Sequence, residues 1–161
     1  MKFQGKTAIV TGGSRDIGRA ISVKLASEGA NVVVNYFSNE GDADATLEAI
    51  ETAGGGKAIK VRADVTKSED VAKLVAAATR RYGVQADILV NNAGGLVARK
   101  PLAEMDEEFF NHVMQLNLTS TFLATKAAAE HMGEGGAIVN LASLAGRDGG
   151  GGGAAAYATS K

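Results

Sequence analysis

Residues 7–18 read TAIVTGGSRDIG and give the strongest indication of how the chain folds. The run 7–10 is short and apolar, as expected of a strand that is buried on both faces. A glycine-rich turn follows it, and from Ile17 the apolar residues recur at helical spacing until Gly29, which should end the helix. In such a strand–turn–helix unit, glycines let the backbone approach a pyrophosphate, which binds at the unpaired N–H groups of the helix N-terminus. The stretch therefore predicts a nucleotide site.

The same alternation continues along the rest of the chain. Strand-like apolar runs lie at 32–34, 58–61, 88–90 and 137–141, and amphipathic stretches separate them. Continuous apolar strands that alternate with helices indicate an α/β fold with a parallel sheet and right-handed crossovers. We predict a single domain over residues 1–161, a Rossmann-type doubly wound sheet in three α/β/α layers with strand order 3-2-1-4-5.

Composition narrows the possible functions. The 161 residues carry a formal net charge of −1, so we expect no nucleic-acid partner and no attachment to an anionic membrane. No window approaches the roughly 20 apolar residues of a membrane span, and the N-terminus has no apolar signal region. Cysteine is absent, which excludes disulfides and cysteine-ligated metals, and we expect no metal site. These features fit a cytoplasmic protein.

The glycine-rich segment also resembles a known family. Residues 11–18 match the T-G-x-x-x-G-x-G fingerprint of the short-chain dehydrogenases/reductases at Thr11, Gly12 and Gly18. Asp16 stands where the family usually has its middle glycine. A carboxylate there would repel a pyrophosphate, but Asp is also a good helix N-cap and tolerates unusual φ, and we favour this second interpretation. By the resemblance, the loop residues that bind the cofactor are Gly12, Ser14, Arg15, Asp16, Ile17 and Gly18.

The end of the second strand, residues 35–38, bears on the choice of nucleotide. NAD-binding folds of this type place an acid about 20 residues past the glycines to hold the ribose hydroxyls. None of these four residues is acidic, and Arg15 could pair with a 2′-phosphate through its guanidinium. We therefore predict NADP(H) as the cofactor, with Asn35 and Tyr36 at its ribose. The alternative is that Arg15 is a solvated loop charge.

Two further segments follow strands three and four. Asp64-Val65 resembles the family's adenine-contacting pair, although Asp64 could equally cap the next helix, which we expect to open with a capping box at residues 66–69. The motif at 91–94, Asn91-Asn92-Ala93-Gly94, resembles the family's N-N-A-G, which steadies the central sheet and lines the cofactor site. Its small residues suit close approach of a nicotinamide-ribose, although a plain turn would use the same ones.

Tyr157 and Lys161 have the Y-x-x-x-K spacing, which on a helix places the phenol and the ammonium on one face. A nearby cation favours the phenolate and eases proton exchange with an alcohol or carbonyl oxygen, whereas the alternative is an exposed i,i+4 pair. By resemblance to the family, Tyr157 is the proton donor in reduction, and Lys161 binds nicotinamide-ribose hydroxyls. The resemblance further implies that Ser143 polarises the carbonyl and that Asn117 holds a water of the proton relay.

The resemblance extends from Lys6 to Lys161 and implies hydride transfer between NADP(H) and a carbonyl or secondary alcohol. The implied substrate is a 3-oxoacyl thioester or a sugar- or uronate-like ketone. Family members normally continue past the catalytic lysine, so we expect this sequence to be the front part of a longer chain, or else a truncated form. We also expect a homo-oligomer, dimer or tetramer, joined partly through the helix around 119–132. The alternative function is a non-catalytic or incomplete nucleotide-binding fragment.

Overall fold

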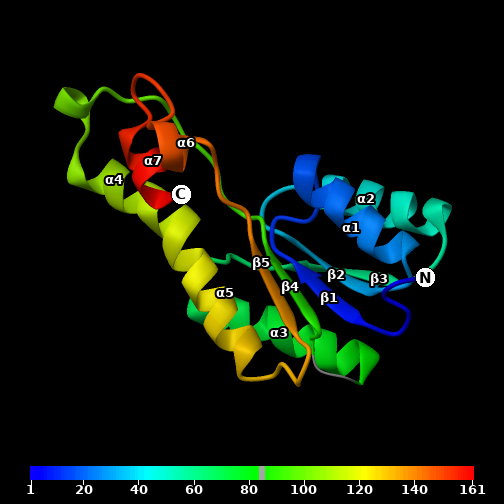
Figure 1. The fold of residues 1–161 in the computed structure, drawn as a ribbon. Coiled ribbons are helices and arrows are strands. Elements are labelled where there is room, and N and C mark those ends of the chain that lie inside the picture. The colour runs from blue at the N-terminus through cyan, green and yellow to red at the C-terminus, as the bar shows by residue number, and fades with distance from the viewer. Residues whose placement is uncertain (84–85) are drawn as a thin grey trace.

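A computed structural model describes residues 1–83 and 86–161 and contains a parallel sheet at its centre (Figure 1). The strand order is β3-β2-β1-β4-β5, as predicted. Val10 lies opposite Val34 on one side and Val90 on the other, so the first strand occupies the middle of the sheet. The strands are β1 (Thr7–Val10), β2 (Asn31–Tyr36), β3 (Ala58–Arg62), β4 (Ile88–Asn91) and β5 (Ala137–Asn140).

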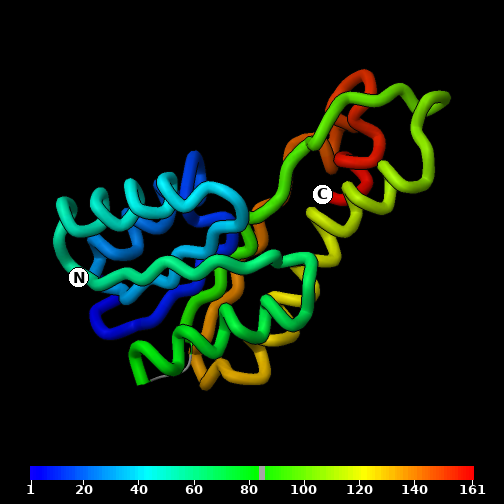
Figure 2. The backbone as a smooth tube through the Cα atoms, turned by 180° about the vertical axis from the view of Figure 1, so that it is seen from behind, coloured from blue at the N-terminus to red at the C-terminus, as the bar shows by residue number. Residues whose placement is uncertain are grey.

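Helices cover both faces of the sheet and complete the three layers. One face carries α1 and α2, and the other carries α3 and α5 (Figure 1). The π-helical segment η2 joins α4 to α5 in one long rod, and α6 and α7 pack with α4 away from the sheet (Figure 2). The helices are α1 (Asp16–Ser27), α2 (Glu40–Ala53), α3 (Ser68–Tyr82), η1 (Leu102–Glu104), α4 (Glu107–Met114), η2 (Gln115–Thr119), α5 (Ser120–Ala129), α6 (Ala145–Asp148) and α7 (Ala155–Ser160).

The central strands are buried because their side chains alternate between two apolar layers. Ala8 and Val10 of β1 pack toward α1 and α2, whereas Ile9 packs with Leu74 of α3 and Leu89 of β4. This two-sided burial explains why the strand sequences are continuously apolar and do not alternate with polar residues. The prediction of a strand covered on both faces is therefore confirmed for β1 and β2.

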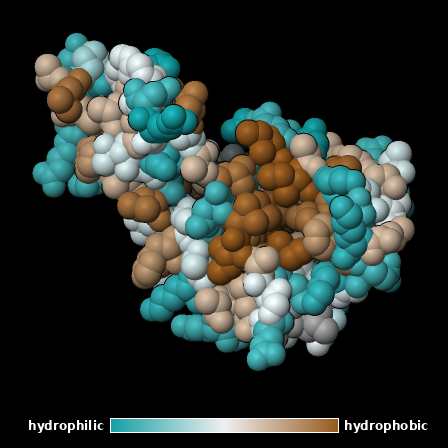
Figure 3. Space-filling view, viewed as in Figure 1, coloured by the Kyte–Doolittle hydropathy of each residue, from teal (hydrophilic) through white to brown (hydrophobic). Residues whose placement is uncertain are grey.

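Strand β5 differs from the others because all four of its residues are exposed. It is an edge strand that pairs with β4 alone. An apolar hollow lies beside it, lined among others by Phe3, Leu25 and Val139, and Figure 3 shows this hydrophobic surface. The sheet therefore has a well-covered centre and an open edge.

Helix starts follow local capping in some places and not in others. Asn39 caps α2 and Asp106 caps α4, each with a side chain that accepts from a backbone N–H three residues on. The predicted capping box at residues 66–69 is wrong: the N-cap of α3 is Lys67, and the Thr66 hydroxyl donates to Asp64 Oδ1 (2.7 Å). Within the described ranges, no helix combines the length and the apolar character needed to cross a bilayer.

Candidate active site

A cleft lies at the carboxyl ends of β1, β2, β4 and β5, where open α/β sheets bind ligands. It runs from the β2–α2 turn, past the glycine-rich loop and the start of α1, to α7. We call the part at the β2–α2 turn, where the ribose was predicted, the ribose end, and the part at α7, which carries the predicted Tyr157, the catalytic end. Eleven of the predicted site residues line it, namely Gly12, Ser14, Arg15, Asp16, Ile17, Gly18, Tyr36, Ala93, Gly94, Tyr157 and Lys161. The other predicted residues are not part of the lining that the described residues form, namely Asn35, Asp64, Val65, Asn91, Asn117 and Ser143.

The glycine-rich loop is held from behind by two asparagines. Asn35 is buried, its Oδ1 accepts from Gly12 N–H (2.9 Å), and its amide donates to the carbonyl of Ala63 (3.0 Å). Asn92 donates from Nδ2 to the carbonyls of Thr11 (3.0 Å) and Gly12 (2.9 Å). Asn35 therefore supports the loop from behind and is not part of the cleft lining formed by the described residues. Asn92, a member of the predicted 91–94 motif, supports the loop and also lines the cleft.

Gly18 is required by the tight packing of this loop. A Cβ at this position would lie 2.1 Å from the Gly12 carbonyl oxygen and 2.7 Å from Asn92 Nδ2. Both atoms belong to the hydrogen-bonded frame of the loop, so they cannot move aside without breaking it. Gly18 at the start of α1 thus packs directly against the loop and against the segment after β4, and there is no space for a side chain at this position.

Asp16 adopts a backbone conformation that non-glycine residues seldom take, with φ of +49°. The interpretation that Asp16 is the N-cap is wrong, because the N-cap of α1 is Arg15 and Asp16 is the first helical residue. The other half of that interpretation, that Asp tolerates an unusual φ, agrees with the structure. The carboxylate is directed to solvent, 77% exposed, with Oδ2 3.6 Å from Nη1 of Arg15. The charge of Asp16 therefore lies next to a cation, not inside the loop.

Arg15 lines the cleft near its ribose end, whereas Lys60 of β3 lies outside the lining formed by the described residues and already has strong partners. Lys60 pairs with Glu40 (2.8 Å) and with Asp44. Hydrogen bonds to the two carboxylates raise the pKa of Lys60, and the bond from Lys60 holds the pKa of Glu40 below its usual range. Arg15 is 72% exposed, with Asp16 as its ion-pair partner among the described residues, so it is the cation best placed to meet an incoming anion.

Asp64 and Val65 are not part of the cleft wall formed by the described residues. Val65 is buried in the core, and Asp64 accepts from both the N–H (2.9 Å) and the hydroxyl of Thr66. The Asp64 N–H donates to Asp70 Oδ2 (3.1 Å). An ion pair with Lys73, together with this bond, lowers the pKa of Asp70. The pair therefore shapes the turn after β3, and its contact with an adenine stays a prediction.

The motif after β4 ties three elements together. Asn91 is buried and donates from Nδ2 to Thr125 Oγ1 of α5 (3.0 Å) and to Asn140 Oδ1 of β5 (2.8 Å). Gly94 lies so close to Asn117 that a Cβ would be 2.5 Å from its Oδ1. Asn91 thus fixes β5 and α5 against β4, as the resemblance implies, while Gly94 brings the backbone to the catalytic end of the cleft.

Asn117 lies in the π-helical segment η2, a type of segment that often marks functional sites. Its side chain is buried and forms a two-bond pair with Gly95, accepting from the N–H (2.9 Å) and donating to the carbonyl (2.9 Å). It also donates to the Val113 carbonyl (3.0 Å). The amide therefore joins the long helical rod to the loop after β4, beside the cleft.

Tyr157 and Lys161 come together at the catalytic end. Lys161 Nζ donates to the Leu141 carbonyl (3.0 Å) and lies 5.9 Å from the centre of the Tyr157 ring. Ser143 is half-buried after β5, its hydroxyl accepts from Ala145 N–H (3.2 Å), and it does not line the cleft formed by the described residues. The structure therefore brings Tyr157, Lys161, Gly94 and Asn117 together but leaves Ser143 beside them.

Sequence reasoning missed residues on the far wall of the ribose end. Besides Tyr36, this wall is formed by Phe37, Ser38 and Asn39 and by Asp42 of α2. Asp42 lies a few residues beyond the end of β2, where the rule of an acid about 20 residues past the glycines looks for it, so that rule did not identify Asp42. Its position at the start of an amphipathic helix was the available signal, because first-turn side chains flank the turn that leads into a helix.

The whole-chain comparison agrees with this geometry: a sequence model of the short chain dehydrogenase family matches residues 6–161. The chain belongs to the short-chain dehydrogenase family. Members of this family are oxidoreductases that bind a nicotinamide cofactor. An uncharacterized oxidoreductase of Methylorubrum extorquens is 47% identical over 143 residues, which are 89% of this chain and 56% of that protein. Glucose 1-dehydrogenase 2 of Bacillus subtilis is 43% identical over 143 residues, covering 87% of this chain and 55% of the relative.

Solved structures of short-chain dehydrogenases superpose closely on this chain. A short-chain dehydrogenase of Burkholderia cenocepacia in complex with NADP has a TM-score of 0.92 and 37% identity, covering 100% of this chain and 64% of that one. The NADH-dependent reductase A1-R′ complexed with NAD also has a TM-score of 0.92 and 37% identity, covering 99% and 68%. The chain thus spans about half the length of the curated relatives above.

Proposed function

We propose that this protein transfers a hydride between NADP(H) and a carbonyl or secondary alcohol substrate. The observation that supports this most is that Tyr157 and Lys161 line the same cleft as the glycine-rich loop. A helix N-terminus that suits a phosphate and a phenol that suits proton donation thus line one cleft, as a dinucleotide-dependent reductase requires.

The side chains at the catalytic end suit proton transfer to a carbonyl oxygen. The Tyr157 phenol would donate its proton as the oxygen gains negative charge, and the ammonium of Lys161 near the ring would stabilise the phenolate that remains. Lys161 is held for this role by the Leu141 carbonyl. A bound nicotinamide would supply the hydride in reduction and accept it in alcohol oxidation.

The cleft suits a dinucleotide because glycine backbone lies against it in two places, at the glycine-rich loop and after β4. The packing around Gly18 and Gly94 leaves no room for a side chain, and α1 begins at the cleft with N–H groups that have no acceptor within the helix. The phosphates would lie on Gly12, Ser14 and the start of α1, and the nicotinamide-ribose near Lys161.

The preference for NADP(H) over NAD(H) rests on Arg15. Its exposed guanidinium could form a two-bond pair with a 2′-phosphate, and residues 35–38 bring no carboxylate to the ribose. Among the similar structures, the Burkholderia protein is described with NADP and reductase A1-R′ with NAD, so family membership by itself does not favour either cofactor.

A sugar- or uronate-like ketone is the substrate class we favour, with a 3-oxoacyl thioester as the alternative. The Bacillus relative is named for glucose, and reductase A1-R′ is described as responsible for alginate metabolism. We further propose a cytoplasmic homo-oligomer. Leu118 and Phe122, one turn apart on the rod that joins η2 to α5, are both exposed and would contribute to an interface between subunits.

The test is a Tyr157→Phe variant, with Tyr82→Phe as its matched control. The loss of the Tyr157 hydroxyl should lower NADPH-dependent reduction of a panel of ketoses, uronates and 3-oxoacyl thioesters by at least about 100-fold, because no group replaces the proton donor. NADPH binding, followed by cofactor fluorescence, should stay unchanged. The Tyr82 hydroxyl is buried without a partner among the described residues, so its removal should leave turnover intact. Substantial turnover by Tyr157→Phe would contradict the proposal.

Nucleotide binding without turnover is the second candidate function. The observation that favours it is the position of Ser143, which lies beside the cleft and not on its wall. In the same experiment this alternative predicts that the unmodified protein binds NADPH but reduces no member of the panel.

A further inference from the structure

We infer that Arg19 is a positioning residue for the phosphate loop: it fixes the Ser14 carbonyl against α2 and thereby turns the Arg15 N–H toward the cleft. The inference rests on the proposed function only insofar as the ligand carries a pyrophosphate. Arg19 does not line the cleft formed by the described residues, so it would act through the loop and not by touching the cofactor.

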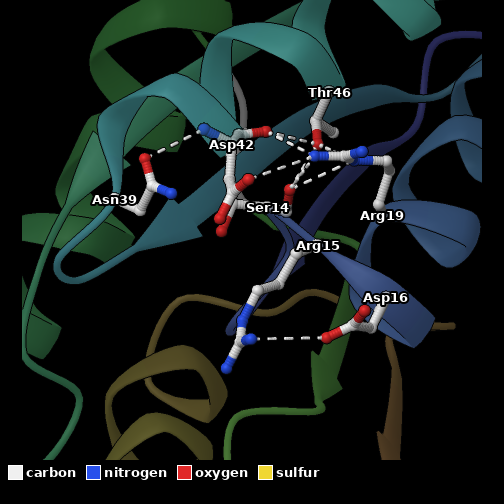
Figure 4. A network of polar contacts seen from close by, with 7 residues as sticks. All are labelled: Ser14, Arg15, Asp16, Arg19, Asn39, Asp42 and Thr46. Atoms are coloured by element: carbon white, nitrogen blue, oxygen red, sulfur yellow. Dashed lines mark hydrogen bonds and ion pairs between the residues drawn. The ribbon is translucent and has the colours of Figure 1, made fainter.

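The Ser14 carbonyl is the centre of this network (Figure 4). Arg19 reaches it from Nη2 (3.0 Å) and from Nε (3.2 Å), and the Thr46 hydroxyl reaches it from α2 (2.7 Å). A single loop carbonyl therefore has three donor atoms within hydrogen-bond distance, two of them from the charged guanidinium of Arg19. Charge-assisted bonds of this kind are stronger than neutral ones, so the orientation of this peptide is well fixed.

The guanidinium is itself held by α2, which makes it a rigid support. Arg19 Nε donates to Thr46 Oγ1 (2.8 Å), and Nη2 donates to the Asp42 carbonyl (3.1 Å). The Asp42 carboxylate adds an ion pair at 3.8 Å. Thr46 is 0% exposed, so no water competes for its hydroxyl. The network thus joins α1, the phosphate loop and the helix that follows the ribose end of the cleft.

The geometry of the peptide bond carries this constraint to the ligand side. In a trans peptide the C=O and the following N–H point in opposite directions, and the described ranges contain no cis peptide. Because the Ser14 carbonyl faces Arg19 and Thr46, the N–H of Arg15 faces away from them, on the side where Ser14 and Arg15 line the cleft. This amide precedes the first turn of α1 and adds a donor where phosphate oxygens are expected.

The constraint matters more in this chain because Asp16 follows directly. Asp16 keeps a left-handed backbone without being glycine, and such residues persist only where the surrounding structure holds them. The carbonyl of Arg15 accepts from Arg19 N–H (3.0 Å), so Arg19 braces both sides of the Arg15 residue. A loop without this support would relax away from the phosphate-binding shape.

The experiment measures the dissociation constants of ADP and of NADPH for variants of the full 161-residue chain, together with their melting temperatures. ADP carries the pyrophosphate but no nicotinamide, so it tests the loop independently of the proposed oxidoreductase activity. Arg19→Met and Thr46→Val should weaken both ligands by roughly tenfold and fivefold, since each removes donors to one carbonyl. Arg19→Lys should restore part of the affinity, because an ammonium can still reach Ser14.

Thr52→Val is the matched control for Thr46→Val. The Thr52 hydroxyl donates to the Glu48 carbonyl (2.9 Å) on the same helix but is exposed and remote from the loop. Each threonine hydroxyl lies 2.9 Å from the carbonyl four residues back, but only that of Thr46 also reaches the loop, at the Ser14 carbonyl. A positioning role therefore predicts that affinity changes for Thr46 alone.

The outcomes separate the two proposals. If the unmodified protein binds ADP and the Arg19 and Thr46 variants bind it equally well, with lower melting temperatures, the network is merely structural and the inference is overturned while the proposed function stands. If affinity falls as expected but no turnover is found, the inference stands and the proposed activity fails. If the unmodified protein binds neither ADP nor NADPH, the loop is not a phosphate site and both are overturned.

Discussion

β1 and β5 are both four-residue parallel strands with apolar sequences, TAIV and AIVN, yet every residue of β1 is buried and every residue of β5 is exposed. β1 has a strand on each side and helices over both faces, whereas β5 pairs with β4 alone. Strand formation thus follows from the local sequence and the hydrogen-bonding partner, but burial depends on what packs around the strand. The contrast divides the site into a cofactor half, residues 7–53, and a catalytic half, residues 137–161.

The two halves differ in how their functional loops are held. In the cofactor half, the glycine-rich loop is fixed by Asn35 and Thr46, both buried. In the catalytic half, Tyr157 lies on the six-residue helix α7, which follows the glycines at 149–153. Two of these glycines accept hydrogen bonds from Arg99, which is exposed. Few buried contacts mean low local stability, so we expect the catalytic half to open more readily.

The largest effect is expected from adding one methyl group to the cofactor half, at Gly18, compared with adding one to the catalytic half, at Gly152. Gly18→Ala would force a Cβ against the Gly12 carbonyl and Asn92. We expect it to lower NADPH affinity by at least about 100-fold and the free energy of unfolding by about 3 kcal/mol. Gly152→Ala is the control, because a Cβ there meets no heavy atom of the described residues within 4 Å. Titration calorimetry and urea unfolding measure both; equal behaviour of the two variants would remove the distinction.

A core truncation tests the contrast between the strands themselves. Ile9→Ala removes a side chain that is 0% exposed and should lower the free energy of unfolding by about 3 kcal/mol through lost burial and a cavity. Val139→Ala removes one that is 50% exposed and should cost less than about 1 kcal/mol. Urea unfolding gives both values. A cost at Val139 as large as that at Ile9 would mean that β5 is covered in solution, for example by a second subunit.

The smallest effect concerns which half sets the nucleotide preference. Arg15→Ala should reduce the ratio of NADPH to NADH affinity by about tenfold, because the 2′-phosphate loses its charged partner. Arg147→Ala, on exposed α6 of the catalytic half, should leave that ratio unchanged. If the ratio is unchanged in Arg15→Ala, Arg15 is a solvated loop charge and does not determine the nucleotide preference.

Features set by short stretches of sequence could be predicted. The parallel α/β class followed from continuous apolar strands that alternate with helices, and the position of Tyr157 beside Lys161 followed from helical spacing. The strand order was predicted as part of a Rossmann-type fold. The loop glycines also lie where the strand–turn–helix pattern put them. The element types and the placing of Tyr157 beside Lys161 depend on neighbours in the chain, so the local sequence contains the information for them.

Features set by packing could not be predicted. Arg19 and Thr46 are in contact because α1 and α2 pack side by side on the sheet, and the sequence of neither helix indicates this contact. The N-cap of α1 is Arg15, a residue type that does not indicate an N-cap, and its side chain forms no capping hydrogen bond. The orientation of Ser143 depends on the turn into α6, where its hydroxyl is used by Ala145.

The central place of β1 has a consequence for how the protein is made. β1 is the first strand to leave the ribosome, yet one of its two neighbours is β4, and the N–H of Thr7 is satisfied by Asp87, 80 residues later. Until the chain has been synthesised beyond Asn91, an apolar edge of β1 therefore has no native partner. Strands whose pairing partners are far away in the sequence fold slowly and are prone to associate wrongly. Over this interval the nascent chain should be more prone to wrong association than after it, and the loop gains its hydrogen bond from Asn92 to Gly12 only once Asn92 has been synthesised.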